Sequence, residues 1–491
     1  MEGQISSLLR SRFTRLPGLF KPPADSGVPH RERPSRHRSR PSATCRPPSA
    51  AQQLPHELIL QILGHLVPSV HTAAYRLPLE ASNFTETLAC SAAREVERSQ
   101  RYLHWASQVC RSWHDVASEL LYASPFLTTT RRMELFIRTV SEVPDLTRFI
   151  KDVYAPLTHH GKVCNLFGWL WGRRSAKAQR EELASLLARC PSIEALTVRH
   201  SVKKSLASIT PVDDVVCTSE INDKLKRLTV HGSSFEARWH PQFSIMPALS
   251  ALPNLEVLCL RGIYILPTFQ LPALPNLHTL QLVENYYFPA AGPRGPLFSQ
   301  ATMPKLRTVE IFRNHFAEAT YGPVFDTSCF SQLECLHFVE DEHCLEVTRW
   351  ADADSKVRHL ALGFLHARDH VELVCWRFPD ALESLTLLLR ERDVPDSEAA
   401  LGGDNSLEIL DGVLHCIKLN IEEASSFKKL SVLAKFPGAR NTKQRLERER
   451  VVDDIRQACL EKGVEFNYSL DAPDGWVAER LTRTHTHASM D

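Results

Sequence analysis

The chain has 491 residues, of which 43% are hydrophobic and 23% are charged, and its formal net charge is +1. This composition is ordinary for a globular protein, and the near-zero charge gives no overall field that would draw the chain to nucleic acid or to an acidic membrane. The sequence has no apolar run of about 18 residues, so we expect no membrane-spanning helix. The 13 cysteines include no C-x-x-C pair and no zinc-type spacing, so we expect reduced thiols, no bound metal and no cofactor.

The first 52 residues differ in composition from the rest of the chain. Residues 1–50 contain eight prolines and ten lysines or arginines against three acidic residues. So few apolar groups cannot offset the entropy lost on ordering, and we expect residues 1–52, and also 471–491, to be disordered tails. Two functional alternatives stay open for the basic tail: a nuclear-import or nucleic-acid contact, and a mitochondrial presequence.

Residues 53–125 carry two apolar stripes that predict a small helical module. The first stripe begins at Leu54-Pro55 and ends at Pro68, and the second begins near Tyr102 and ends before Pro125. We expect one helix for each stripe, with an irregular insertion at about 67–100 between them. The stripes consist of Leu58, Ile59, Ile62, Leu63 and Leu66, and of Leu103, Ala106, Val109, Cys110, Trp113, Val116, Ala117, Leu120 and Leu121.

Residues 126–470 contain eight copies of the pattern L-x-x-L-x-L, with Ile, Val or Phe in place of some leucines. The first residues of successive copies lie 22 to 32 residues apart. Such self-similarity predicts a stack of similar units, each with one short strand, whose leucines form a continuous core behind a parallel sheet. The copies begin at Ile193, Leu225, Leu255, Leu277, Leu306, Leu333, Val357 and Leu382.

The segments around these copies predict further elements. Apolar spacing favours helices in two places, and a glycine is well placed to end the second of them. Short β-prone stretches before and after the repeats predict an additional strand at each end. We expect the helices at 180–190 and 442–460, the helix end at Gly463, the strands at 150–153 and 464–466, and a loop at 391–406.

The strands of this stack should present one face to a binding partner. Alternate side chains of a strand point to opposite faces, so each copy turns its leucines one way and the intervening residues the other way, onto the concave side. The mixed chemistry of this side suits protein recognition, and the lack of a uniform basic stripe disfavours nucleic acid. The candidate substrate-binding residues are Arg199, His231, Arg261, Gln281, Glu310, Phe312, His337 and His359.

Two parts of the sequence resemble known families. Leu54-Pro55, the stripe that follows and the segment Val109-Cys110-Arg111-Ser112-Trp113 resemble an F-box, and the eight copies resemble irregular leucine-rich repeats. Family repeats often carry Asn at the ninth position, as Asn285 and Asn314 do here. The F-box resemblance implies docking on the Skp-family adaptor of a cullin–RING (SCF) ubiquitin ligase. By that resemblance, the adaptor-binding residues are Leu54, Pro55, Leu58, Ile62, Val109, Cys110 and Trp113.

The expected fold class is α/β: a small all-α F-box-like module followed by an irregular leucine-rich-repeat solenoid with a parallel sheet on its concave face. No nucleotide-binding, nucleophile-elbow or metalloprotease pattern occurs, so we expect no enzyme activity. The expected function is substrate recognition for the ubiquitin ligase, in the cytoplasm or nucleus. Two alternatives stay open: a repeat scaffold without ligase coupling, and a nucleic-acid-associated factor that uses the basic tail.

Overall fold

The structure is a computed structural model in which the chain divides into two units, residues 1–51 and 52–491. Every described residue belongs to the second unit. The expected tails at 1–52 and 471–491 lie outside the described residues, as do Asn314 and the expected loop up to residue 405. The described residues are 54–66, 91–127, 130–159, 176–202, 215–216, 221–232, 246–265, 270–287, 297, 299–312, 315–316, 329, 331–339, 355–365, 377–390, 406–421, 425–435 and 442–470.

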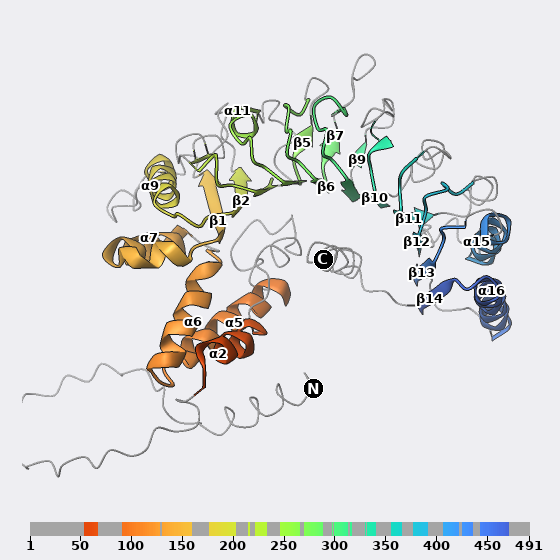
Figure 1. Ribbon diagram of the computed structural model, residues 1–491, viewed down its shortest axis with the longest axis horizontal. Helices are drawn as coiled ribbons and strands as arrows, with labels where there is room; N and C mark the ends of the chain where they lie inside the picture. Colours follow the sequence, from red (N-terminus) through yellow and green to blue (C-terminus); the bar gives the residue numbers. More distant parts are fainter. Residues whose placement is uncertain are drawn as a thin grey trace, which may run out of the picture. The chain divides into compact units, whose positions relative to one another are not determined.

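An open sheet of eleven parallel strands dominates the described part of the chain (Figure 1). Each of the eight L-x-x-L-x-L copies supplies one strand, and neighbouring copies pair in chain order, so the predicted parallel sheet is confirmed. The strands, in order across the sheet, are β1 (Asp152–His159), β2 (Ala195–Val202), β3 (Arg227–His231), β4 (Val257–Arg261), β6 (Thr279–Val283), β8 (Thr308–Phe312), β10 (Cys335–Val339), β11 (His359–Leu365), β12 (Ser384–Arg390), β13 (Lys429–Lys435) and β14 (Glu465–Leu470).

The main hydrophobic core lies on the face of this sheet that carries the repeat leucines. Leu258 and Leu260 of β4 are fully buried, and the two equivalent positions are buried in all eight copies. Helices cover the same face: α9 (Ala176–Ala188), α11 (Met246–Ser250), α15 (Ser406–Ile421) and α16 (Thr442–Glu461). Because each unit buries its leucines against the next, one core runs through the whole stack.

Several elements beyond the copies follow the sequence prediction. α9, α16 and β14 are confirmed, whereas the strand expected at 150–153 begins two residues later, as β1. Gly463 follows α16 with a φ of +71°, a conformation that favours glycine. Five elements were not predicted from the sequence: α7 (Thr130–Glu142), the 3₁₀ helix η2 (Pro144–Phe149), α11, α15 and β13.

A second, smaller parallel sheet runs beside the main one. Its strands are β5 (Tyr264–Ile265), β7 (Tyr286–Tyr287) and β9 (His315–Phe316), which follow β4, β6 and β8 along the chain. Positive φ values and a close backbone contact mark the turns between the two sheets. Gly262 and Glu284 have positive φ values of 61° and 50°, and a Cβ on Gly232 would lie 2.2 Å from the carbonyl oxygen of Gly262. The chain therefore turns tightly after β3, β4 and β6.

Three further helices form a helical module with a core of its own. They are α2 (His56–Gly64), α5 (Ser91–Ala106) and α6 (Arg111–Ala123). The module core is separate from the core behind the sheet, and Leu54, Trp113 and Leu120 are partly buried against it. Its buried residues are Ile59, Leu63, Leu103, Ala106, Val116 and Ala117.

The expected single helix from Tyr102 onward is wrong, because the second stripe forms two helices. Residues 107–110 make a turn in which the Ser107 hydroxyl donates to the His104 carbonyl at 2.7 Å, and Cys110 is extended with a φ of −164°. α5 also begins at Ser91, inside the expected irregular insertion. The apolar spacing continues through the turn because α5 and α6 bury their stripes in the same core, so the spacing does not reveal the break.

Candidate interaction surfaces

The helical module leaves large apolar side chains exposed. Leu58 on α2 is 45% exposed, Trp105 near the end of α5 is 44% exposed, and Val109 in the turn before α6 is 46% exposed. A small module with more apolar surface than it can bury commonly uses that surface to bind another protein. Leu58 and Val109 belong to the expected adaptor-binding set. Trp105 was not predicted, because it lies outside the segments that resemble an F-box and off the apolar stripe of its helix.

The other expected adaptor-binding residues have mixed roles. Leu54 and Trp113 pack against the module core, whereas Pro55 is exposed and directly precedes α2. Ile62 and Cys110 are half-buried. The Cys110 sulfur lies 3.3 Å from the Ser112 hydroxyl, and this contact, together with the Trp113 amide, lowers the pKa of the thiol. The exposed members of the set can therefore bind a partner directly, and the packed members shape the module.

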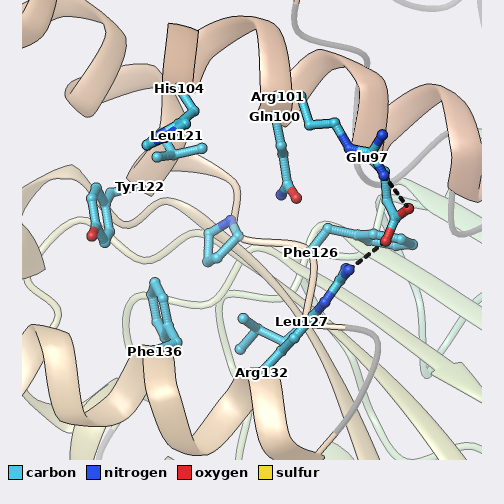
Figure 2. A pocket seen from close by; sticks show the side chains of 11 residues that line it. Glu97, Gln100, Arg101, His104, Leu121, Tyr122, Phe126, Leu127, Arg132 and Phe136 are labelled. Atoms are coloured by element: carbon cyan, nitrogen blue, oxygen red, sulfur yellow. Dashed lines mark hydrogen bonds and ion pairs between the residues drawn. The ribbon is translucent and has the colours of Figure 1, made fainter. Parts of the chain in front are cut away.

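A pocket of about 370 Å³ lies between α5, α6 and α7 (Figure 2). On one side of the pocket, Glu97 forms ion pairs with Arg132 at 2.5 Å and with Arg101 at 3.8 Å. The rings of Tyr122 and Phe136 face each other on the other side, with their centroids 6.0 Å apart. Because Glu97 belongs to α5 and Arg132 to α7, this charged cluster joins the module to the helix that precedes the sheet.

The polar face of the sheet is the face opposite the leucine core. On β2, β3 and β4 the strand register aligns Arg199, His231 and Arg261 as neighbours. Both Nε and Nη2 of Arg261 donate to one carboxylate oxygen of Glu284, at 3.2 and 2.9 Å. Tyr154 of β1 contacts Arg199, and burial raises the pKa of its hydroxyl. This end of the polar face therefore carries two arginines, and Glu284 neutralises part of the charge of Arg261.

The central part of the polar face carries a chain of hydrogen-bonding side chains. The register places Gln281, Glu310 and His337 next to one another on β6, β8 and β10. Nε2 of Gln281 donates to one Glu310 oxygen at 2.9 Å, and the other oxygen lies 3.6 Å from Nδ1 of His337. Nε2 of His337 in turn lies 3.2 Å from the sulfur of Cys335. Four side chains from three strands are thus linked in one row.

The polar face is more buried than the sequence analysis anticipated. Of the eight candidate residues, only His359 is exposed and Arg199 half-buried. A partner that approaches this face therefore meets these two side chains first. The buried candidates are His231, Arg261, Gln281, Glu310, Phe312 and His337, each with at most 8% of its surface exposed.

Cys335 is not among the candidate substrate-binding residues predicted from the sequence. The signal was available, because Cys335 and His337 are two residues apart on a strand and alternate side chains share a face. The contribution of Glu310 comes from a neighbouring strand, β8, and depends on the register. The other predicted polar-face residues lie at equivalent positions of neighbouring strands, as strand alternation predicts.

Within the described ranges, no helix combines the length and the apolar character needed to cross a membrane. Among those same residues, no three His, Cys, Asp or Glu side chains are placed to hold a metal ion. No protein-family model matches the sequence. A search of curated proteins also finds no match.

Proposed function

We propose that this protein is a substrate receptor of a cullin–RING ubiquitin ligase. In this proposal the helical module is an F-box that docks on a Skp-family adaptor, and the polar face of the leucine-rich repeats binds a protein substrate. Ubiquitin transfer belongs to other subunits, and this chain contributes proximity and orientation.

The observation that carries the proposal is the separation of two cores with exposed apolar residues on the smaller one. The module buries six residues in its own core while Leu58, Trp105 and Val109 each stay almost half exposed. The sheet has its own continuous core, and Tyr122 at the end of α6 packs against it from the module. Such a division suits an adaptor, because one part can bind the ligase while the other binds the substrate.

Capture of a purified Skp-family adaptor by the full chain tests the adaptor half of the proposal. Leu58→Asp and Val109→Asp place a charge where the proposal needs apolar contact, so we expect each to weaken capture at least tenfold, a loss of about 1.4 kcal/mol or more. Leu419→Asp is the matched control, because Leu419 lies on α15 and is 51% exposed. Alanine at Leu54 or Trp113 is a weaker test, since both side chains also support the module core.

The outcomes separate the candidate functions. The ligase assignment is supported if Leu58→Asp and Val109→Asp both abolish capture of the adaptor and Leu419→Asp preserves it. If the unmodified chain does not bind the adaptor, or if both variants bind as well as it does, the ligase assignment is wrong and a repeat scaffold without ligase coupling becomes the better description.

A further inference from the structure

We propose that Cys335 is a reactive thiol that exchanges with small disulfides, activated by His337 and Glu310 at the centre of the polar face. The Cys335 sulfur lies 3.2 Å from Nε2 of His337, and Nδ1 of the same ring lies 3.6 Å from a Glu310 oxygen. The second Glu310 oxygen accepts from Gln281 at 2.9 Å, which holds the carboxylate in place. A thiol, a base and a group that orients the base are the components of an activated sulfur nucleophile.

The surroundings favour the ion-paired form of this group. Burial alone lowers the pKa of His337, but the contacts with Cys335 and Glu310 outweigh it and raise that pKa to about 10. A protonated imidazole at 3.2 Å stabilises a thiolate, and it does so more strongly away from bulk water. The thiolate is the form of cysteine that attacks disulfides.

Other buried cysteines provide the contrast. Cys259 lies on the same polar face, on β4, and burial raises the pKa of its thiol to about 12. Cys190 and Cys416 lie in the main core, and burial raises their pKa values to about 11 and about 12. Burial by itself therefore raises the pKa of a cysteine thiol in this protein, and the imidazole beside Cys335 is the feature that distinguishes it from these three.

The exchange step conserves atoms and charge. The Cys335 thiolate attacks one sulfur of a small disulfide, a new S–S bond forms, and the S–S bond of the reagent breaks. The second half of the reagent leaves as a thiolate and takes up a proton from His337 or from water. Cys335 is only 3% exposed, so small uncharged disulfides are the expected reactants.

The experiment treats the full native chain with the small neutral disulfide dithiodipyridine and follows each cysteine by mass spectrometry. We expect Cys335 to react faster than Cys259 at neutral pH. We also expect its rate to stay nearly constant as the pH rises from neutral into the alkaline range, because the sulfur is already a thiolate. His337→Gln should slow Cys335 at least tenfold and leave Cys259 unchanged, and Glu310→Gln should slow it less.

The pH profile of the unmodified chain needs no variant, so the proposal remains testable if His337→Gln does not fold. Fast labelling of Cys259 in His337→Gln would show that the variant is unfolded. In that case the pH profile of the unmodified chain is the test of the proposal. A Cys335 rate that climbs about tenfold for each pH unit through the alkaline range would show an ordinary thiol that merely donates to His337, and would overturn the proposal. An unchanged Cys335 rate in folded His337→Gln protein would also overturn it.

Discussion

Asn285 is hydrogen-bonded to Leu260 of the preceding repeat: its Nδ2 donates to the Leu260 carbonyl at 2.9 Å. Its Oδ1 accepts from the amide of Ile263 at 3.0 Å, and the side chain is fully buried. A single residue thus satisfies two backbone groups of the neighbouring unit where the chain turns away from β4. This is a structural basis for the asparagine that the sequence places at the ninth position of the copy.

Asn285→Ala should therefore be strongly destabilising. It leaves a buried N–H and a buried C=O without their side-chain partner, which costs about 2 to 4 kcal/mol. Asn254→Ala is the matched control, because Asn254 is exposed and makes one bond, to the Asp223 carbonyl at 3.0 Å. Urea unfolding of both variants measures the difference. Equal losses would show that the buried pair of bonds is not the source of the effect.

Gly232→Ala should also destabilise the sheet. The added Cβ would lie 2.2 Å from the Gly262 carbonyl oxygen, a backbone atom, so the turn after β3 has to move. We expect a loss of about 2 kcal/mol or more in unfolding free energy. Gly64→Ala, at the end of α2, meets no atom within 4 Å and should be neutral or stabilising by up to about 1 kcal/mol. Thermal unfolding distinguishes the two, and a harmless Gly232→Ala would contradict the tight turn.

Asp152 should make stability depend on pH. Burial raises the pKa of its carboxyl from 3.8 to about 6, and the attraction of Arg227 only partly opposes this. The folded chain therefore holds the proton more tightly, and this stabilising contribution is full below pH 3.8 and is lost as the pH rises through about 6.

Asp152→Asn removes this dependence. At neutral pH the variant should be more stable than the unmodified chain by about 2 to 3 kcal/mol, and below pH 3.8 the two should unfold alike. Unfolding curves at acid and neutral pH check this. If the variant has the same advantage at both pH values, the effect comes from packing and not from the buried charge.

Glu97→Gln should weaken the link between α5 and α7. The Glu97 side chain is 12% exposed, accepts a hydrogen bond from Arg132 and forms an ion pair with Arg101, so losing the charge should cost about 1 to 2 kcal/mol. Glu142→Gln is the control, because Glu142 and its partner Arg138 are both 68% exposed and the pair should contribute well under 1 kcal/mol. Chemical unfolding compares them, with equal effects as the contradicting result.

The repeat strands could be predicted from the sequence because each copy places two apolar side chains on one face of its strand. Leu280 and Leu282 of β6 are a typical pair, and both are fully buried. β13 was missed because its pattern begins with Phe427 and is separated from the previous copy by α15, which the sequence analysis did not predict. The helix break at 107–110 was missed because it leaves the apolar spacing undisturbed.

The spacing of the apolar residues was therefore enough to predict the eight repeat strands and the side chains that share each face, since alternation is a local property of an extended chain. The folded chain was needed to show which polar-face residues are buried, that the Asp152 carboxyl is buried, and that Glu310 lies 3.6 Å from the His337 ring. These properties depend on how side chains of neighbouring strands pack and on what covers each face, and the alternation within one strand specifies neither.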